Sequence, residues 1–414
     1  MKNIFKKIIS YLLRIESQLV LFKYKPKIIA ITGSVGKTST KDAVYAVLSI
    51  VSHVRKSEKS YNSEIGLPLT ILGVPNGWNN SFRWFLNIFK GLWLFLWPHK
   101  YPKWLILEVG VGKEGDMRKT ASWLKTDVVI ITAIGETPAH IEFFSSRKNL
   151  IEEKSQLVKT LNKDGLLILN ADDDDVLAMK NKTKCKILTY GFKKGADIMG
   201  SEIDILYEDI PKEPLEHSST GKPKGVIFRI DEEGKSLPVT IEGVFSKNHI
   251  YASLASITLS FGLKLNIINV IDALKHYDVP PGRMRLLKGV KDCLIIDDSY
   301  NSSPTACKVA LETLGQVKGF DRKIAILGDM LELGKYTIGA HKNIGKIAKE
   351  NCDVLVVVGP RAKSIKEGAI EVKMSEENPR QSEVNIFEFL NSLEAGEIMK
   401  TFVQKKDLVL IKGS

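Results

Sequence analysis

The stretch AITGSVGKTSTKDA, residues 30–43, constrains the fold more than any other part of the sequence. It follows the apolar run IIAIT, which predicts a buried strand, and it leads into a helix that we expect to begin at Thr38. Gly33 and Gly36 allow a tight turn whose backbone N–H groups point at phosphate, and the helix N-terminus adds positive potential. Lys37 would reach the terminal phosphates, and Thr38 would bind magnesium through its hydroxyl. Ile31 stands where the usual phosphate-loop pattern has its first glycine, so the loop belongs to a shorter form.

Apolar runs and helical segments alternate along most of the chain, which predicts an α/β fold. We expect a central P-loop domain with a mostly parallel sheet over residues 27–279, completed by antiparallel strands between about residues 189 and 244. A proline-rich hinge at Pro280–Pro281 would lead into a smaller, Rossmann-like α/β domain over residues 280–414. Residues 1–26 would form an amphipathic helix.

Composition excludes some classes of protein and leaves others open. The chain has 414 residues and a formal net charge of +12, which favours anionic partners such as nucleotides, nucleotide sugars or an acidic membrane surface. The net charge alone does not distinguish among these partners. Four cysteines lie far apart, so a CxxC metal site and a dense disulfide framework are both excluded.

Two segments resemble membrane spans only at first sight. Residues 1–25 place apolar side chains on one stripe of a helix and basic side chains elsewhere on it. Charged residues break the apolar runs of this segment, and no small-residue cleavage site follows, so it is not a signal peptide. Residues 82–104 are rich in tryptophan and phenylalanine, but Arg83 and Lys90 interrupt them and Pro98 ends the run before the roughly 20 residues that a span needs. Both segments either pack on the protein's own core or form a basic aromatic surface that rests on a membrane interface.

Several motifs along the chain resemble those of the Mur ligase superfamily, in the family's order. They are the short phosphate loop, YNSEIGLPLTIL, LILEVGVGKEGDM, PAHIEFF, LNADD, PPGRM, IIDDSYNSSP, ILGDMLELG and a closing LIKGS. The resemblance covers the chain from about residue 28 to its end, and it is strongest to the members that add D-alanyl-D-alanine to a UDP-linked muramoyl tripeptide.

The resemblance implies a chemistry and its metal ligands. In these ligases ATP phosphorylates the substrate carboxylate, and an amine then displaces phosphate from the acyl phosphate. Glu108 matches a ligand that holds the first Mg²⁺ with Thr38, and His140 matches a ligand of a second Mg²⁺. Lys154 matches a lysine that is carbamylated to supply an extra anion beside the metal. From the residues alone, three other interpretations stay open: a solvated carboxylate for Glu108, a core or capping histidine for His140 and a surface lysine for Lys154.

The remaining site residues also follow from the resemblance. Lys37, His140 and Lys154 are expected to be catalytic, and Asn62, Glu64 and Gly66 to face the substrate. The residues expected to bind ATP are Gly33, Ser34, Val35, Gly36, Lys37, Thr38, Ser39, Asn248, His249, Arg283, Asp297, Asp298, Tyr300 and Asn301. The aspartates follow an apolar run, and open α/β sheets place ligand-binding groups at that end of a strand.

The chain departs from the family pattern in three places. Asn248 and His249 stand in reversed order and Ala252 replaces a later asparagine, so the adenine contact is open. The chain stops at KGS, where relatives continue into a further helix. We expect no UDP-binding domain before residue 28, which leaves open how the substrate is held.

These features predict a cytoplasmic, monomeric ligase with no nucleic-acid partner and a possible peripheral membrane contact. Its partners would be a nucleotide-linked or lipid-linked muramoyl peptide and D-Ala-D-Ala. Two alternatives stay open: another carboxylate–amine ligase, such as a folylpolyglutamate synthase, and a partner-dependent subunit that binds a lipid-linked wall precursor.

Overall fold

The computed structural model describes residues 2–57, 61–138, 140–208, 222–232, 235–275, 277–371 and 384–414. The chain divides into two compact units. Unit 1 comprises Met1–Ile134, Phe143–Met199 and Tyr251–Leu274, and unit 2 comprises Gly135–Glu142, Gly200–Ile250 and Lys275–Ser414. Each unit is described on its own.

Unit 1 is built on a parallel sheet whose central strand is β1 (Lys27–Thr32). β1 pairs in parallel with β3 (Trp104–Glu108) on one side and β4 (Thr126–Ile131) on the other. The further strands are β2 (Val54–Lys56) beside β3, and then β5 (Leu161–Asn170) and β6 (Lys186–Gly191) beyond β4. Residues 28–32 are buried, as a run of apolar residues in a parallel sheet should be. The carboxyl ends of these strands lie at one edge, and the phosphate loop begins there.

Helices cover the sheet of unit 1, and the expected alternation of strands and helices is confirmed. They are α2 (Lys37–Ser49), α5 (Asp116–Ala121), α6 (Arg147–Ser155), α7 (Asp174–Leu177), α8 (Lys247–Gly262), which begins in unit 2, and α9 (Ile267–Lys275). Short 3₁₀ turns η2 (Gln156–Thr160) and η3 (Ala178–Lys182) follow α6 and α7. Asp173 caps α7 by accepting a hydrogen bond from the Val176 N–H.

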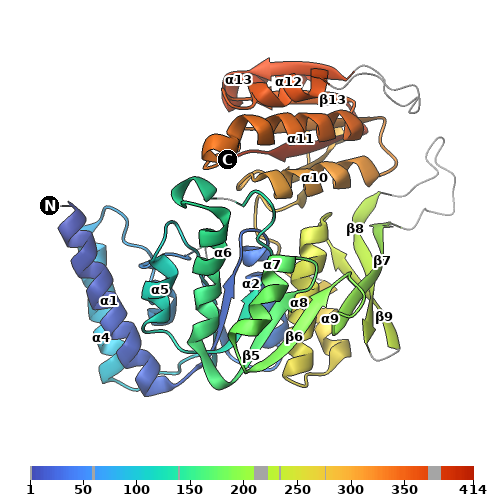
Figure 1. Ribbon diagram of the computed structural model, residues 1–414. Helices are drawn as coiled ribbons and strands as arrows, with labels where there is room; N and C mark the ends of the chain where they lie inside the picture. The colour runs from blue at the N-terminus through green and yellow to red at the C-terminus, as the bar shows by residue number, and fades with distance from the viewer. Residues whose placement is uncertain are drawn as a thin grey trace. The chain divides into compact units, whose positions relative to one another are not determined.

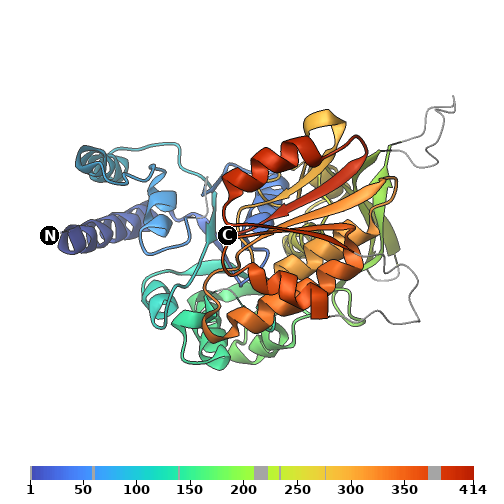
Figure 2. The same ribbon diagram turned by 90° about the horizontal axis from the view of Figure 1, so that it is seen from above.

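Three further helices of unit 1 pack together as a separate layer. They are α1 (Lys2–Tyr24), α3 (Gly66–Leu72) and α4 (Ser81–Leu96). Figures 1 and 2 both show α1 and α4 side by side. Both candidate membrane segments therefore form helices that contact the protein itself. Among the described residues, no helix has the length and apolar character needed to cross a bilayer.

Unit 2 contains two groups of strands. The first group is β7 (Ile198–Tyr207), whose first two residues still belong to unit 1, with β8 (Pro223–Glu232) and β9 (Lys235–Glu242). The strand order of this sheet is β2-β3-β1-β4-β5-β6-β7-β8-β9. β8 and β9 are antiparallel, as expected. The expectation of antiparallel strands is wrong for β6 and β7, which pair in parallel; the turn-rich sequence between them gave no sign of this.

The second sheet of unit 2 has the order β10-β11-β15-β12-β13-β14. Its strands are β10 (Arg285–Lys288), β11 (Leu294–Asp298), β12 (Arg322–Gly328), β13 (Val354–Val358), β14 (Asn385–Phe389) and β15 (Asp407–Lys412). All pairs are parallel except β10 with β11. The accompanying helices are α10 (Pro304–Gln316), α11 (Thr337–Asn351), α12 (Lys363–Glu371) and α13 (Ser392–Phe402), with 3₁₀ turns at η1 (Ile141–Phe143), η4 (Val290–Asp292) and η5 (Gly334–Tyr336). The expected Rossmann-like domain is confirmed.

Both faces of this sheet are covered. Ile324, Val354 and Val356 pack with Met399 of α13 in one apolar cluster. The alternate residues Ala325, Leu327 and Leu355 are also buried, and because side chains alternate along a strand they face the other side. Helices α10, α11 and α12 contact one another in succession, as Figure 1 shows for α10 and α11.

Candidate active site

The phosphate loop of unit 1 depends on its two glycines. Gly33 has φ 149° and Gly36 has φ 85°, values that favour glycine. A Cβ atom at Gly33 would lie 2.0 Å from Oγ1 of Thr132, so no larger residue fits there. The Thr132 hydroxyl in turn donates to the carbonyl oxygen of Val35 at 2.6 Å. The loop is therefore held in shape by the end of β4.

Not all of the loop N–H groups are directed as the sequence predicts. The N–H groups of Ser34 and Val35 both donate to the carbonyl oxygen of Ala133, at 2.6 and 3.1 Å. The N-terminus of α2 follows, with Gly36 at the cap position and no side chain capping the helix. A long helix that begins without a side-chain cap offers backbone N–H groups and positive potential to an anion.

Thr38 and Glu108 meet beside this helix N-terminus. The Thr38 hydroxyl donates to Oε2 of Glu108 at 3.1 Å, and both side chains are buried, Glu108 being 1% exposed. They come together because Ile31 of β1 pairs with Glu108 of β3 in the sheet. One hydroxyl and one carboxylate fit Mg²⁺, which takes oxygen ligands and usually binds through one or two carboxylates together with substrate phosphates.

Two lysines converge on the carbonyl oxygen of Gly33. Lys37 Nζ and Lys154 Nζ each lie 2.9 Å from it. Lys154, near the end of α6, is 2% exposed. Burial, with the positive charge of Lys37 nearby, holds the pKa of Lys154 well below its usual value. The Lys154 side chain is therefore a buried amine inside the candidate site, not a surface lysine.

A further buried lysine was missed by sequence reasoning. Lys41 is 1% exposed, and its Nζ lies 3.9 Å from Oε2 of Glu108 and 3.8 Å from Oδ1 of Asp42. It donates to the Ser57 carbonyl oxygen at 3.1 Å, while Lys56 pairs with Asp42 at 2.6 Å. The signal was available: Lys41 follows Lys37 by one helical turn and thus lies on the same face of α2.

The predicted substrate loop lies beside the end of β3. The Gly110 N–H donates to the Asn62 carbonyl oxygen at 2.9 Å, two residues after Glu108. Gly66 begins α3, and a Cβ atom there would lie 2.6 Å from the backbone of Tyr61. Glu64 is exposed. The structure thus places this loop at the same edge of the sheet as the phosphate loop.

The expected nucleotide residues of unit 2 form a second set. Arg283 lies with its guanidinium carbon 4.1 Å from the centre of the Tyr300 ring. Asp297 accepts from the Gly282 N–H at 3.0 Å, and the Tyr300 N–H donates to the Gly282 carbonyl oxygen at 3.1 Å. The glycine at 282, with φ 70°, is thereby fixed next to Tyr300.

Lys412 organises the neighbouring turn of unit 2. Its Nζ lies 2.5 Å from Oδ2 of Asp298 and donates to the Asn301 carbonyl oxygen at 3.0 Å. Burial raises the pKa of Asp298, and the charge of Lys412 acts in the opposite direction. Sequence reasoning gave Lys412 no role, although it is the lysine of the closing LIKGS motif.

His140 and His249 each have partners within unit 2. His140 Nδ1 pairs with the Glu332 carboxylate, and both side chains are partly exposed. His249 is buried: Nδ1 bonds to the Tyr277 hydroxyl and Nε2 to the Arg283 carbonyl oxygen at 2.8 Å. Burial lowers the pKa of His249 to about 4. A neutral His249 thus holds the backbone of Arg283 in place. The neighbouring Asn248 is partly exposed.

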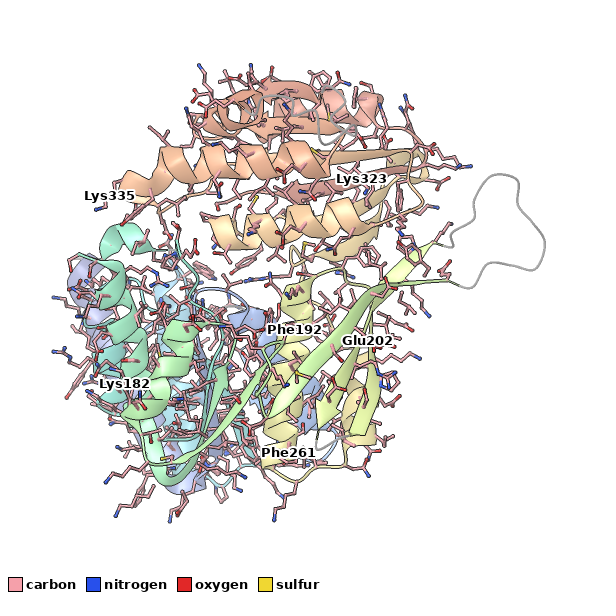
Figure 3. All side chains as sticks on the ribbon, turned by 45° about the vertical axis from the view of Figure 1, so that its right-hand side comes forward. Lys182, Phe192, Glu202, Phe261, Lys323 and Lys335 are labelled. Atoms are coloured by element: carbon pink, nitrogen blue, oxygen red, sulfur yellow. The ribbon has the colours of Figure 1, made fainter. Side chains whose placement is uncertain are left out.

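An aromatic pair of unit 1 adjoins the aspartates after β5. Figure 3 labels Phe192, which follows β6, and its ring meets the Tyr251 ring edge-on at 5.2 Å between centroids. The Tyr251 hydroxyl donates to Oδ2 of Asp172 at 2.7 Å, and the Phe192 N–H donates to the same oxygen at 2.8 Å. These contacts fix the start of the unit 1 part of α8.

The sequence-predicted residues thus fall into two sets. Unit 1 brings together the phosphate loop with Ser39, Glu108 and Lys154; unit 2 contains His140, Asn248, His249, Arg283, Asp297, Asp298, Tyr300 and Asn301. Within the described ranges, no group of three or more histidine, cysteine or acidic side chains forms a metal cluster. A cavity of about 700 Å³ in unit 2, between α13 and its sheet, is lined mainly by apolar side chains and does not contain the phosphate loop.

Two domain models and several known proteins match this chain. A model of the Mur ligase middle domain matches residues 31–213, and a model of the Mur ligase glutamate ligase domain matches residues 282–414. The UDP-N-acetylmuramoyl-tripeptide–D-alanyl-D-alanine ligase of Bacillus subtilis is 27% identical over 389 residues, which are 94% of this chain and 73% of that protein.

Two solved structures share the fold. The MurF ligase of Thermotoga maritima in complex with ADP has a TM-score of 0.76 at 23% identity, and the alignment covers 98% of this chain and 80% of that one. A folylpolyglutamate synthase of Mycobacterium tuberculosis, solved with ADP and AMPPCP, has a TM-score of 0.65 at 14% identity, covering 97% of this chain and 92% of that one. At these identities the likeness shows the fold alone.

Proposed function

Because this chain belongs to the Mur ligase family of ATP-dependent amide-bond-forming ligases, we propose that it joins D-Ala-D-Ala to the terminal carboxylate of a muramoyl tripeptide. The tripeptide would be linked to a nucleotide or a lipid, and the reaction would serve wall synthesis on the cytoplasmic side of the membrane. The observation that carries the proposal is the Thr38–Glu108 pair beside the uncapped N-terminus of α2.

The reaction would run in two steps. A carboxylate oxygen of the tripeptide attacks the γ-phosphorus of ATP, which breaks the bond to ADP and gives an acyl phosphate. The amine of D-Ala-D-Ala then attacks the acyl carbon, phosphate leaves, and the amine loses a proton. Lys37 would stabilise charge on the transferred phosphoryl group, and the N–H groups at the start of α2 would hold the phosphates.

Thr38 and Glu108 would hold one Mg²⁺, whose chemistry is to neutralise charge on the phosphate oxygens. His140 is proposed as a ligand of a second Mg²⁺. Lys154 is proposed to be carbamylated, and its lowered pKa supports this, because only the neutral amine attacks CO₂. A carbamate would replace this buried neutral amine near Lys37 with an anion, and a carboxylate-like anion is a ligand that Mg²⁺ accepts.

The other sequence-predicted residues keep their proposed roles. Arg283, Asp297, Asp298, Tyr300 and Asn301 are proposed to bind ATP, and so are Asn248 and His249. Asn62, Glu64 and Gly66 would face the peptide. Support comes from their placement: the nucleotide residues gather around one turn of unit 2, and the peptide loop shares a sheet edge with the phosphate loop.

A substrate panel tests the proposal. The purified chain is incubated with ATP and Mg²⁺, and phosphate release is measured with UDP-linked muramoyl tripeptide plus D-Ala-D-Ala, with each component omitted in turn. We expect release that requires both components, and a product heavier by the dipeptide in mass spectrometry. Release with a reduced folate plus glutamate instead would favour the folylpolyglutamate synthase alternative. Release that needs no amine would contradict ligation.

A further inference from the structure

Helix α4 carries an apolar stripe that the described part of the protein does not cover. Phe82, Phe85, Phe89, Trp93 and Leu96 recur at spacings of three and four residues and are 43% to 68% exposed. This spacing puts them on one face of the helix. We call these five residues, with Leu86 and Trp97, the α4 stripe.

The opposite face of α4 contacts the rest of unit 1. Trp84, Asn87 and Gly91 are its buried residues, at spacings of three and four, and α4 packs there on α1 and α3. One face of α4 is therefore already buried against α1 and α3. The α4 stripe takes no part in the packing of unit 1. An exposed apolar patch of this kind normally marks an interaction surface.

The end of α4 is held firmly. Lys23 Nζ donates to the carbonyl oxygens of Phe95 and Trp97 at 2.6 and 2.7 Å, and the Tyr24 hydroxyl donates to that of Leu94 at 2.9 Å. These bonds satisfy carbonyl groups that a helix C-terminus leaves without partners. The stripe is thus presented on a helix that α1 fixes at its end.

The charges around the stripe have one sign. Residues 1–31 and 74–104 contain eleven lysines and arginines and one acidic residue. That acidic residue, Glu16, is buried and packs against Gly91 of α4. Arg83 and Lys90 on α4 are exposed, as are Lys100 and Lys103 after it. No carboxylate in these two segments is exposed to oppose an anionic surface.

Aromatic side chains beside basic ones are the pattern of a helix that lies in the membrane interface. The 16 residues of α4 are too few to cross a bilayer, which needs about 20. Trp93 and Trp97 stack at 4.1 Å between ring centroids, so two indole rings lie together at one end of the stripe. Lipid phosphates complement the surrounding charge, whereas a second copy of the same face would repel it.

We propose that the α4 stripe is a docking surface for an anionic lipid bilayer, with its aromatic side chains at headgroup depth and Arg83 and Lys90 on lipid phosphates. This inference does not rest on the proposed reaction. It makes the protein a peripheral membrane protein attached reversibly through one helix.

Flotation of the full chain with vesicles tests this. We expect the protein to float with phosphatidylglycerol–phosphatidylcholine vesicles at low salt, less at high salt, and little with phosphatidylcholine alone. The triple variant Phe85→Ser/Phe89→Ser/Trp93→Ser should lower the partition coefficient by about tenfold or more, because it removes the inserted side chains. Arg83→Gln/Lys90→Gln should lower it by about fivefold per residue.

Matched controls come from unit 2. Leu393 and Ile338 are 82% and 63% exposed, so Leu393→Ser/Ile338→Ser removes exposed apolar side chains elsewhere. Lys308→Gln/Lys400→Gln removes exposed charge elsewhere in the same way. Both controls should float like wild type. Circular dichroism and thermal unfolding check that each variant is folded.

A second measurement does not depend on multiple polar substitutions. Brominated lipids should quench the tryptophan fluorescence of the wild type, and the effect should shrink in Trp93→Phe/Trp97→Phe, which keeps the surface apolar. Several results would overturn the proposal: no flotation at low salt, equal loss in stripe and control variants, or binding that ignores anionic lipid. A concentration-dependent dimer abolished by the stripe variant, without vesicle binding, would assign the surface to a second copy of the chain instead.

Discussion

Glu16 provides a test of the packing of α1 on α4. Its side chain is 8% exposed, and among the described residues its Oε2 has no hydrogen-bond partner. The carboxyl group lies so close to Gly91 that a Cβ atom there would be 2.2 Å from Oε2. Burial raises the pKa of Glu16 to about 7.

The raised pKa fixes the sign of a pH effect. Between the ordinary value of 4.5 and about 7, folded Glu16 keeps a proton that the unfolded chain has lost. Because the folded state binds more protons in this window, the free energy of unfolding is highest at low pH and falls as the pH rises through 7. Linkage with these two values gives a loss of about 2 kcal/mol between pH 5.5 and pH 8, or about 1 kcal/mol if solvent screens the group in part.

The variant Glu16→Gln removes the titration and keeps the size of the side chain. Urea unfolding is followed by tryptophan fluorescence, because the six tryptophans all lie in unit 1. Wild type should lose about 1 to 2 kcal/mol relative to Glu16→Gln between pH 5.5 and pH 8, whereas Glu64→Gln, at an exposed position, should track wild type throughout. If the difference in the free energy of unfolding between wild type and Glu16→Gln stays constant with pH, the claim that Glu16 is buried with a raised pKa is refuted.

Three further variants test the candidate site. Lys37→Ala should abolish phosphate release, because Lys37 would stabilise charge on the transferred phosphoryl group. The control Lys119→Ala changes an exposed lysine of the same unit and should leave release unchanged. Near-normal turnover by Lys37→Ala would remove the phosphate loop from the mechanism. Wild type purified without CO₂ should lose turnover and regain it when bicarbonate is added. Lys154→Met should turn over slowly, at a rate that bicarbonate does not change. A ¹³C carbamate signal that persists in Lys154→Met would assign the modification to another residue. Lys412→Met should lower the free energy of unfolding by about 3 kcal/mol because it strands the buried Asp298, with Lys412→Met/Asp298→Asn partly restored; an unchanged unfolding curve would show that the pair is unimportant.

The elements of the fold were largely predictable because they depend on short-range patterns. Runs such as IIAI and VLVVV are apolar throughout, as strands buried on both faces of a parallel sheet are. The antiparallel β10 was missed because its burial is slight: Arg285 and Leu287 are exposed, so its sequence lacks the signature of a core strand.

Site residues that belong to a sequence motif were predictable. Residues whose environment depends on tertiary packing were not. The Thr38–Glu108 pair follows from strand order and the positions of both motifs. Lys41 and Glu16 look like ordinary charged residues on helix surfaces, and only the tertiary contacts bury them. The stripe on α4 was seen as aromatic sequence, but which of its side chains face outward depends on how α1 and α3 cover the other side.

The central claim is that this chain transfers a phosphoryl group to a carboxylate before it forms an amide bond. The direct measurement uses muramoyl tripeptide labelled with ¹⁸O in its terminal carboxylate, together with ATP, Mg²⁺ and D-Ala-D-Ala, and weighs the released phosphate by mass spectrometry. Attack by the carboxylate predicts that each phosphate formed carries one ¹⁸O atom from the peptide. Phosphate free of ¹⁸O from fully labelled peptide would mean that water, not the carboxylate, had attacked ATP, and would contradict the ligase mechanism.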